Sequence, residues 1–162
     1  MKLRHLFFAC SGVFVMMFSL LLLVVIVFSD EEDGGSDGNL IYGGVSVSQE
    51  VLAHKPMLEK YAREYGIEEY LNVLLAIIQV ESGGTLEDVM QSSESLGLPP
   101  NSLSTEESIK QGCKYFSELL AAAETKGCDL NSVIQSYNYG GGFLDYVAGR
   151  GKKYTFELAV SF

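Results

Sequence analysis

The chain has 162 residues, of which 48% are hydrophobic, and a formal net charge of −10 at pH 7. This length leaves room for one compact domain beside the apolar N-terminal run, which excludes a multidomain enzyme and a transporter with many membrane spans. Nucleic acid is also excluded as a partner, because an acidic chain without a basic stripe repels phosphate backbones.

The first feature along the chain is an apolar run over Leu6–Phe28 that holds no charged residue. As a helix it would be about 34 Å long, slightly more than the roughly 30 Å of a bilayer's hydrocarbon core. Because Lys2 and Arg4 precede it and acids follow it, we expect residues 1–5 to be a cytoplasmic stub and the rest to lie outside the cell. A cleavable signal peptide is the alternative, but its apolar region would be shorter and end in small residues. We therefore favour an uncleaved, single-pass transmembrane anchor over residues 6–28.

A tether and one domain are expected to follow the anchor. Residues 29–47 are acidic and rich in glycine, with too little apolar surface to fold, so they are predicted to form the tether. Residues 48–162 are predicted to form a single domain in which helical patterns dominate and no segment indicates a strand.

The domain begins with two helical patterns. Ser48 can cap a first helix, which Pro56 interrupts and Gly66 ends. The second pattern, over residues 68–80, is apolar on nearly all sides, so this helix should be central and buried. The glycine pair at 83–84 ends it.

The second half of the domain is also predicted to be helical. Residues 85–101 contain glycine and two prolines and are predicted to be a loop or a short hairpin. Ser104 and Glu107 then fit a capping box for a helix that extends to Gly127. Three shorter helices complete a mainly α domain, one capped by Asp129 or Asn131 and two near residues 143–148 and 155–161.

Cysteine and histidine residues indicate neither a disulfide nor a metal site. The helix expected to end near Lys126 places Cys113 roughly 20 Å before that end, too far for the chain to return to Cys128. We therefore expect two free, buried thiols. His5 and His54 are isolated, so no metal or other cofactor is expected.

Glu81 is the first candidate for chemistry, because it ends the buried helix. A carboxylate there faces the negative end of the helix dipole, and the apolar helix behind it removes water. Both effects raise its pKa and favour the protonated form that a general acid needs near neutral pH. The alternative is an ordinary, solvent-facing glutamate in the last turn of a helix.

Three segments of the sequence, one of which contains Glu81, together resemble a known family. Glu81–Gly84, Asp88–Gln91 and Ser136–Gly140 follow one another in an order and spacing that resemble the goose-type lysozyme and lytic transglycosylase superfamily. The stretches Asp88–Ser95 and Ser136–Phe143 are similar, more closely, to the membrane-anchored muramidase domains of Gram-positive conjugative elements. The resemblance implies a lysozyme-like, goose-type helical domain that acts on peptidoglycan.

The resemblance also assigns roles to two carboxylates. Glu81 matches the general acid that protonates the glycosidic oxygen between N-acetylmuramic acid and N-acetylglucosamine. Asp88 matches a second carboxylate, at a position where transglycosylases have glycine. A second carboxylate favours hydrolysis by water, whereas without one the sugar closes an anhydro ring on itself. The alternative for Asp88 is an acid in an acid-rich loop without a catalytic role.

The remaining matches concern substrate binding and setting. The positions that match the sugar cleft are Ser82, Met90, Gln91, Tyr137 and Asn138, of which Ser82 is better suited to supporting the helix end than to acting as a nucleophile. The resemblance implies a muramidase on the cell-wall side of the membrane that opens peptidoglycan locally, with proteins of a conjugation or type IV secretion channel as possible partners. A lytic transglycosylase and a non-catalytic, glycan-binding scaffold are the alternatives.

Overall fold

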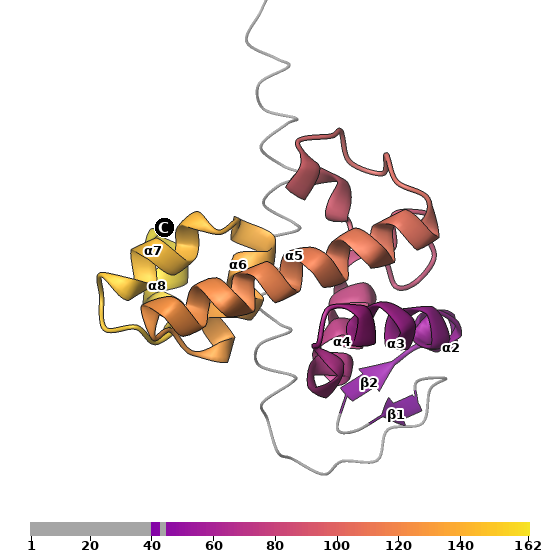
Figure 1. Ribbon diagram of the computed structural model, residues 1–162, viewed down its shortest axis with the longest axis horizontal. Helices are drawn as coiled ribbons and strands as arrows, with labels where there is room; N and C mark the ends of the chain where they lie inside the picture. Colours follow the sequence, from indigo (N-terminus) through magenta and orange to yellow (C-terminus); the bar gives the residue numbers. More distant parts are fainter. Residues whose placement is uncertain (1–39, 43–44) are drawn as a thin grey trace, which may run out of the picture.

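The computed structural model describes residues 40–42 and 45–162 (Figure 1). The first described elements are two short strands, β1 (Leu40–Tyr42) and β2 (Val45–Val47), which pair in antiparallel register with Leu40 opposite Val47. The prediction that the chain up to residue 47 lacks folded structure is therefore wrong for this hairpin, which precedes the helical domain expected over residues 48–162. Its strand β2 contacts helix α4 and buries Val47 completely, which gives the short ladder apolar support.

The predicted anchor over residues 6–28 lies outside the described residues, as does the predicted stub over residues 1–5. Within the part of the chain that is described, none of the helices combines the length and the apolarity needed to cross a bilayer.

The N-terminal helices surround the buried one. Helices α2 (Gln49–Ala53) and α3 (Lys55–Glu64) follow the hairpin, with the Ser48 side chain capping α2 and a proline in the first turn of α3. A 3-10 turn, η1 (Glu68–Tyr70), then leads into α4 (Leu71–Glu81).

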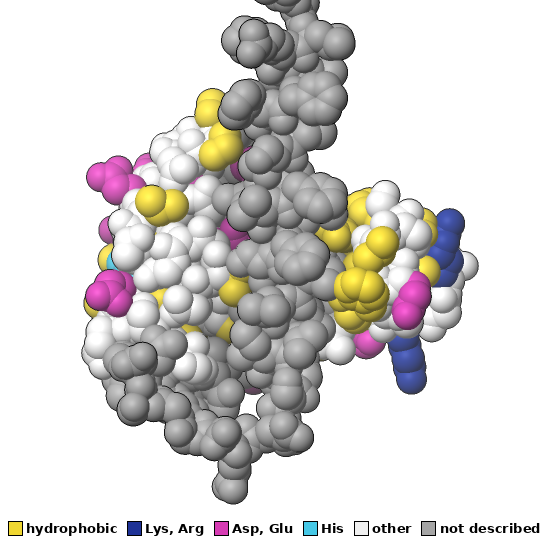
Figure 2. All heavy atoms as spheres, turned by 180° about the vertical axis from the view of Figure 1, so that it is seen from behind, with side chains coloured by type: hydrophobic (Ala, Val, Ile, Leu, Met, Phe, Trp, Pro, Cys, Tyr) yellow, Lys and Arg dark blue, Asp and Glu magenta, His cyan; other side chains and the backbone are white. Residues whose placement is uncertain are grey.

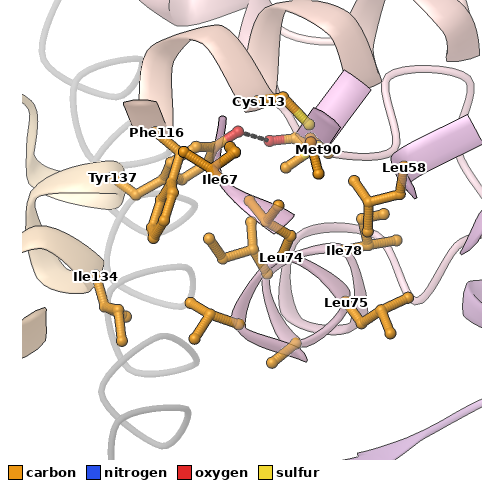
Figure 3. Packing of buried hydrophobic residues seen from close by; sticks show 14 of the residues in the cluster. Leu58, Ile67, Leu74, Leu75, Ile78, Met90, Cys113, Phe116, Ile134 and Tyr137 are labelled. Atoms are coloured by element: carbon orange, nitrogen blue, oxygen red, sulfur yellow. Dashed lines mark hydrogen bonds between the residues drawn. The ribbon is translucent and has the colours of Figure 1, made fainter. Parts of the chain in front are cut away.

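Helix α4 is the centre of the core, as predicted. Every residue from Val73 to Ile78 is buried, and neighbouring elements cover the helix on several sides. Figure 3 shows Leu74 and Ile78 of α4 among Leu58, Met90 and Phe116, which come from three other segments. The burial of this helix fixes the place of Glu81 at its end.

The longest helix in the described part of the chain, α5 (Thr105–Lys126), joins two lobes. It begins with the predicted capping box of Ser104 and Glu107 and ends at Gly127, whose φ of 71° lies in the left-handed region. In Figure 1 it runs across the molecule, with α2–α4 near its first half and α7 and α8 near its end. The loop before it contains the 3-10 helix η2 (Ser92–Leu96).

The C-terminal lobe contains three helices: α6 (Leu130–Tyr139), α7 (Gly142–Ala148) and α8 (Phe156–Ser161). Of the two caps predicted for α6, Asp129 and Asn131, the structure has Asp129, whose side chain accepts a hydrogen bond from the amide of Ser132. Hydrophobic side chains gather on the outside of this lobe (Figure 2), where Phe156, Val160 and Phe162 are exposed.

Both described cysteines are free thiols, which confirms that they form no disulfide. Cys113 is buried on α5, and burial raises the pKa of its thiol to about 12. Cys128 is only half-buried, so the prediction that both thiols are buried is correct for one of them.

Candidate active site

A polar cleft lies where the end of α4, the loop with η2, and helices α5 and α6 meet. It has a volume of about 220 Å³. Its walls consist of acidic, amide, hydroxyl and aromatic groups, contributed by Glu81, Gln91, Ser92, Glu94, Ser95, Tyr115, Tyr137, Asn138, Tyr139 and Gly140. Such a mixture suits a carbohydrate, because aromatic rings pack on sugar C–H groups while polar groups bind hydroxyls.

Glu81 is the last residue of α4 and lies at the wall of this cleft. Burial against the core raises its pKa to about 7, and the negative charges of Glu94 and Asp88 contribute to the same shift. The direction is the one expected for a carboxyl group at the end of an apolar helix. Near neutral pH a large fraction of Glu81 is therefore protonated and able to donate a proton.

Ser82 holds the turn after Glu81 together. Its hydroxyl donates a hydrogen bond of 2.8 Å to the carbonyl of Val89 and accepts one of 3.0 Å from the amide of Gly84. The side chain thus joins the end of α4 to the loop that contributes Gln91. Ser82 does not line the cleft, so its place fits the support of the helix end rather than contact with a sugar.

The glycine pair after Glu81 allows the N-terminal segment to pack closely. Gly84 has a φ of +76°, and a Cβ atom there would lie 2.7 Å from the backbone of Glu50. On the same side, a ring nitrogen of His54 lies 2.9 Å from the Gly84 carbonyl oxygen. The Ser48 hydroxyl also donates to the Gly83 carbonyl oxygen. These contacts fix the backbone directly behind Glu81.

Asp88 is fully buried and does not line the cleft. Its Oδ1 accepts hydrogen bonds from the Ser108 hydroxyl at 2.6 Å and the Ser92 amide at 2.9 Å, and its Oδ2 accepts one from the Ser93 amide at 3.3 Å. Sequence spacing brings Asp88 near Glu81, as the charge effect on Glu81 shows. The structure does not bring its carboxylate to the cleft surface, however, and uses it to hold the start of η2.

Gln91 lines the cleft from a strained backbone position. Its φ of 46° lies in the left-handed region that favours glycine. The side-chain nitrogen donates hydrogen bonds of 2.8 Å to the carbonyl of Asp88 and to Oδ1 of Asn101. These bonds hold the strained residue and fix the direction of its amide, leaving its oxygen to face other partners.

Met90 and Tyr137 form the floor beneath the cleft. The Tyr137 hydroxyl donates a hydrogen bond of 3.1 Å to the Met90 carbonyl oxygen (Figure 3). Both side chains are buried, and Gly112 of α5 makes room for them: a Cβ atom there would lie 2.5 Å from the Met90 sulfur. Tyr137 also contributes to the cleft lining, whereas Met90, predicted to bind substrate, supports the cleft from below.

Asn138 offers an unused donor to the cleft. Among the described residues, no group accepts a hydrogen bond from its buried side-chain nitrogen. A buried donor without a partner carries a desolvation cost that a bound ligand can relieve. An acetamido carbonyl of a bound sugar has the chemistry to accept this bond.

Glu94 is a carboxylate of the cleft that the sequence did not single out. It lies in η2, is exposed, and lines the cleft together with Glu81. In the sequence it is one acid among several in the same loop, and no local pattern separates it from Glu87.

Within the described part of the chain, no group of histidine, cysteine, aspartate and glutamate side chains could hold a metal ion.

Comparison with known proteins agrees with the helical architecture and the cleft. A family model described as Lysozyme-like matches residues 48–162. The chain belongs to this lysozyme-like family. The match begins at the residue that caps α2, so it covers all the described helices and every residue of the cleft.

The chain is also similar to several individual proteins. The chain is 44% identical, over 79% of its length, to the bifunctional muramidase/DL-endopeptidase CwlT of Bacillus subtilis, and 39% identical, over 72%, to the uncharacterized membrane protein YocA of the same organism. A crystal structure of a Staphylococcus aureus protein, described as similar to lipoprotein of the NLP/P60 family, has 76% identity over 70% of this chain and a TM-score of 0.70. The chain spans 38% of CwlT, 52% of YocA and 39% of the staphylococcal chain.

Proposed function

We propose that the chain is a peptidoglycan N-acetylmuramidase, which hydrolyses the bond between N-acetylmuramic acid and N-acetylglucosamine. The observation that carries this proposal is the place of Glu81, a carboxyl group with a pKa of about 7 at the wall of a polar cleft. A general acid for glycoside cleavage needs such a pKa, because it must hold a proton near neutral pH. The similarity to a muramidase of Bacillus subtilis supports the same activity.

Each part of the cleft has a role in the proposed reaction. Glu81 donates its proton to the glycosidic oxygen as the bond to the sugar carbon breaks, and water supplies the new oxygen substituent. Asn138 and Gln91 offer amide groups to the acetamido and hydroxyl substituents. Tyr115 and Tyr139 supply aromatic surface along the sugar ring. None of these steps requires a metal or an organic cofactor.

The proposal extends to the cellular setting. The apolar run at residues 6–28, with basic residues before it, supports a single-pass anchor that leaves the domain on the cell-wall side of the membrane. Similarity to a protein described as a membrane protein supports the same location. An enzyme held there would open peptidoglycan locally, as assembly of a conjugation or secretion channel requires.

One observation favours a second candidate, a lytic transglycosylase. Asp88, the predicted second carboxylate, is buried and fully hydrogen-bonded instead of facing the cleft. Without a carboxylate to activate water, the muramic acid C6 hydroxyl can attack and form a 1,6-anhydro product. The chemical form of the product therefore separates the two candidates.

The test is digestion of purified peptidoglycan by the full-length protein, with mass spectrometry of the soluble fragments. We expect fragments with reducing muramic acid ends from wild type, none from Glu81→Gln, and wild-type amounts from Glu87→Gln, a matched control on an exposed glutamate outside the cleft. Anhydro ends would identify a transglycosylase. Wild-type protein that binds glycan but releases no fragments would identify a scaffold.

A further inference from the structure

We propose that Glu94 is the carboxylate that activates the attacking water, and that Asp88 is the positioning residue that holds Glu94 at the cleft. This inference rests on the proposed muramidase function and names the group that completes it. The resemblance by position assigns contact with the reacting water to Asp88, whereas the inference assigns that contact to Glu94 and leaves Asp88 the support of the loop.

The composition of the cleft is the first support. Among the described residues that line it, the two with carboxylate side chains are Glu81 and Glu94, and they come from different elements, α4 and η2. Hydrolysis by two carboxylates places one beside the leaving oxygen and the other beside the water. If Glu81 is the general acid, Glu94 is the remaining carboxylate of the described lining that can lie beside the water.

The state of the Glu94 side chain is the second support. It is exposed, and within the described part of the chain no hydrogen bond or ion pair occupies its carboxylate. A general base must reach the proton that it removes at hydrogen-bond distance, so a free and accessible carboxylate meets the requirement. The charge of Glu94 also raises the pKa of Glu81, which agrees with two carboxylates that face a shared space.

Asp88 does not meet this requirement. Both of its oxygens accept hydrogen bonds from the protein, and the residue is fully buried. To activate water, Asp88 would therefore have to give up a hydrogen bond from Ser108, Ser92 or Ser93. The loss of any one of these bonds would leave a buried polar group without a partner.

The same bonds explain how Asp88 acts on Glu94. The amides that it binds belong to the first two residues of η2, and Glu94 is the next residue along the chain. The Ser92 hydroxyl donates to the Ser108 carbonyl oxygen, and Gln111 donates to the Ser95 hydroxyl, so α5 holds η2 on both sides of Glu94. Loss of the Asp88 carboxylate would release this short helix and displace Glu94.

The proposed step balances as follows. The bond between the muramic acid C1 and the glycosidic oxygen breaks, and the Glu81 proton moves to that oxygen. The water oxygen bonds to C1, and one water proton moves to the Glu94 carboxylate. Exchange with solvent then returns Glu94 to its ionised form and Glu81 to its protonated form, so no other reactant is required.

The test compares Glu94→Gln, Glu94→Ala and Asp88→Asn in the full-length protein, with Glu87→Gln as the matched control. We expect Glu94→Gln to lower kcat by about 100-fold or more, within the usual contribution of general acid–base catalysis, with thermal unfolding unchanged. Azide is a nucleophile that needs no base, so it should restore turnover to Glu94→Ala and yield a muramic acid azide detectable by mass spectrometry. Asp88→Asn should lower both kcat and the unfolding temperature, without rescue by azide.

Three results would overturn the inference. Glu94→Gln with more than a third of wild-type activity would remove Glu94 from the reaction, and a loss in Glu94→Ala that azide does not relieve would deny it the task of activating water. Azide rescue of Asp88→Asn would assign that task to Asp88. Failure of the proposed function is distinguishable, because it appears already as anhydro products from wild type or as full activity in Glu81→Gln.

Discussion

The ionisation of Glu81 in the folded protein has a measurable cost for stability. In the unfolded chain this carboxyl group ionises near its ordinary pKa of 4.5, whereas in the folded protein it ionises near 7. Between these two pH values the folded state binds more protons than the unfolded state, so the free energy of unfolding falls as the pH rises. The full loss, reached above pH 7, is about 3 kcal/mol for this displacement of the pKa.

Replacement of Glu81 by glutamine removes this effect. The variant has nearly the same shape but no ionisable group, so we expect it to be more stable than wild type by about 3 kcal/mol at pH 8 and about equally stable at pH 4. Urea unfolding followed by far-ultraviolet circular dichroism at several pH values measures the difference. Because all other titratable groups are shared, the pH dependence of the difference comes from Glu81 and from its interaction with the neighbouring charges of Glu94 and Asp88.

The outcome can refute the reasoning directly. A stability difference between wild type and Glu81→Gln that stays constant from pH 4 to pH 8 would show that Glu81 ionises alike in both states, and the argument for a general acid would lose its physical basis. Glu87→Gln is the control, because the same substitution at an exposed side chain should change the free energy of unfolding by only a few tenths of a kcal/mol.

Three further predictions concern activity and the cleft floor. The kcat/KM of the wild type should fall about tenfold for each pH unit above 7, because only protonated Glu81 is active. A pH–rate profile on purified peptidoglycan measures this fall, and a flat profile up to pH 9 would contradict the prediction. Gly112→Ala should lower the free energy of unfolding by about 1–3 kcal/mol, since the new methyl group would overlap the Met90 sulfur, and thermal unfolding measures the effect. Ser108→Ala should cost about 2–3 kcal/mol in the same assay, because it removes a buried hydrogen bond to the charged Asp88; an unchanged unfolding temperature would rule out that bond.

The helices were predictable from the sequence because their boundaries depend on local signals. Ser104 with Glu107 starts α5, Gly127 ends it and Asp129 caps α6, and each signal acts within a few residues of its own position. The hairpin before residue 48 was missed for the opposite reason. Its second strand is stabilised by contact with α4, which no pattern in the strand itself reveals.

The cleft was only partly predictable. Glu81 could be found because its unusual pKa follows from the helix that it ends. The burial of Asp88 depends on Ser108, which lies 20 residues further along the chain, so spacing alone could not distinguish a loop support from a cleft carboxylate. The place of Glu94 at the cleft depends on the same long-range bond between Asp88 and Ser108. No signal near Glu94 in the sequence therefore distinguishes it from the other acids of the loop.

The contacts of Ser48 also determine where mechanical load enters the domain. Its amide donates to the side chain of Gln79 and its hydroxyl to the carbonyl of Gly83, two positions before and two positions after Glu81. Tension on the chain before Val47 therefore reaches α4 through the packing of β2 and reaches the end of α4 through these bonds. If the domain binds a glycan strand while its N-terminal side is held in place, the resulting force acts on the turn next to Glu81. Mechanical force, like pH, would then affect the state of the cleft.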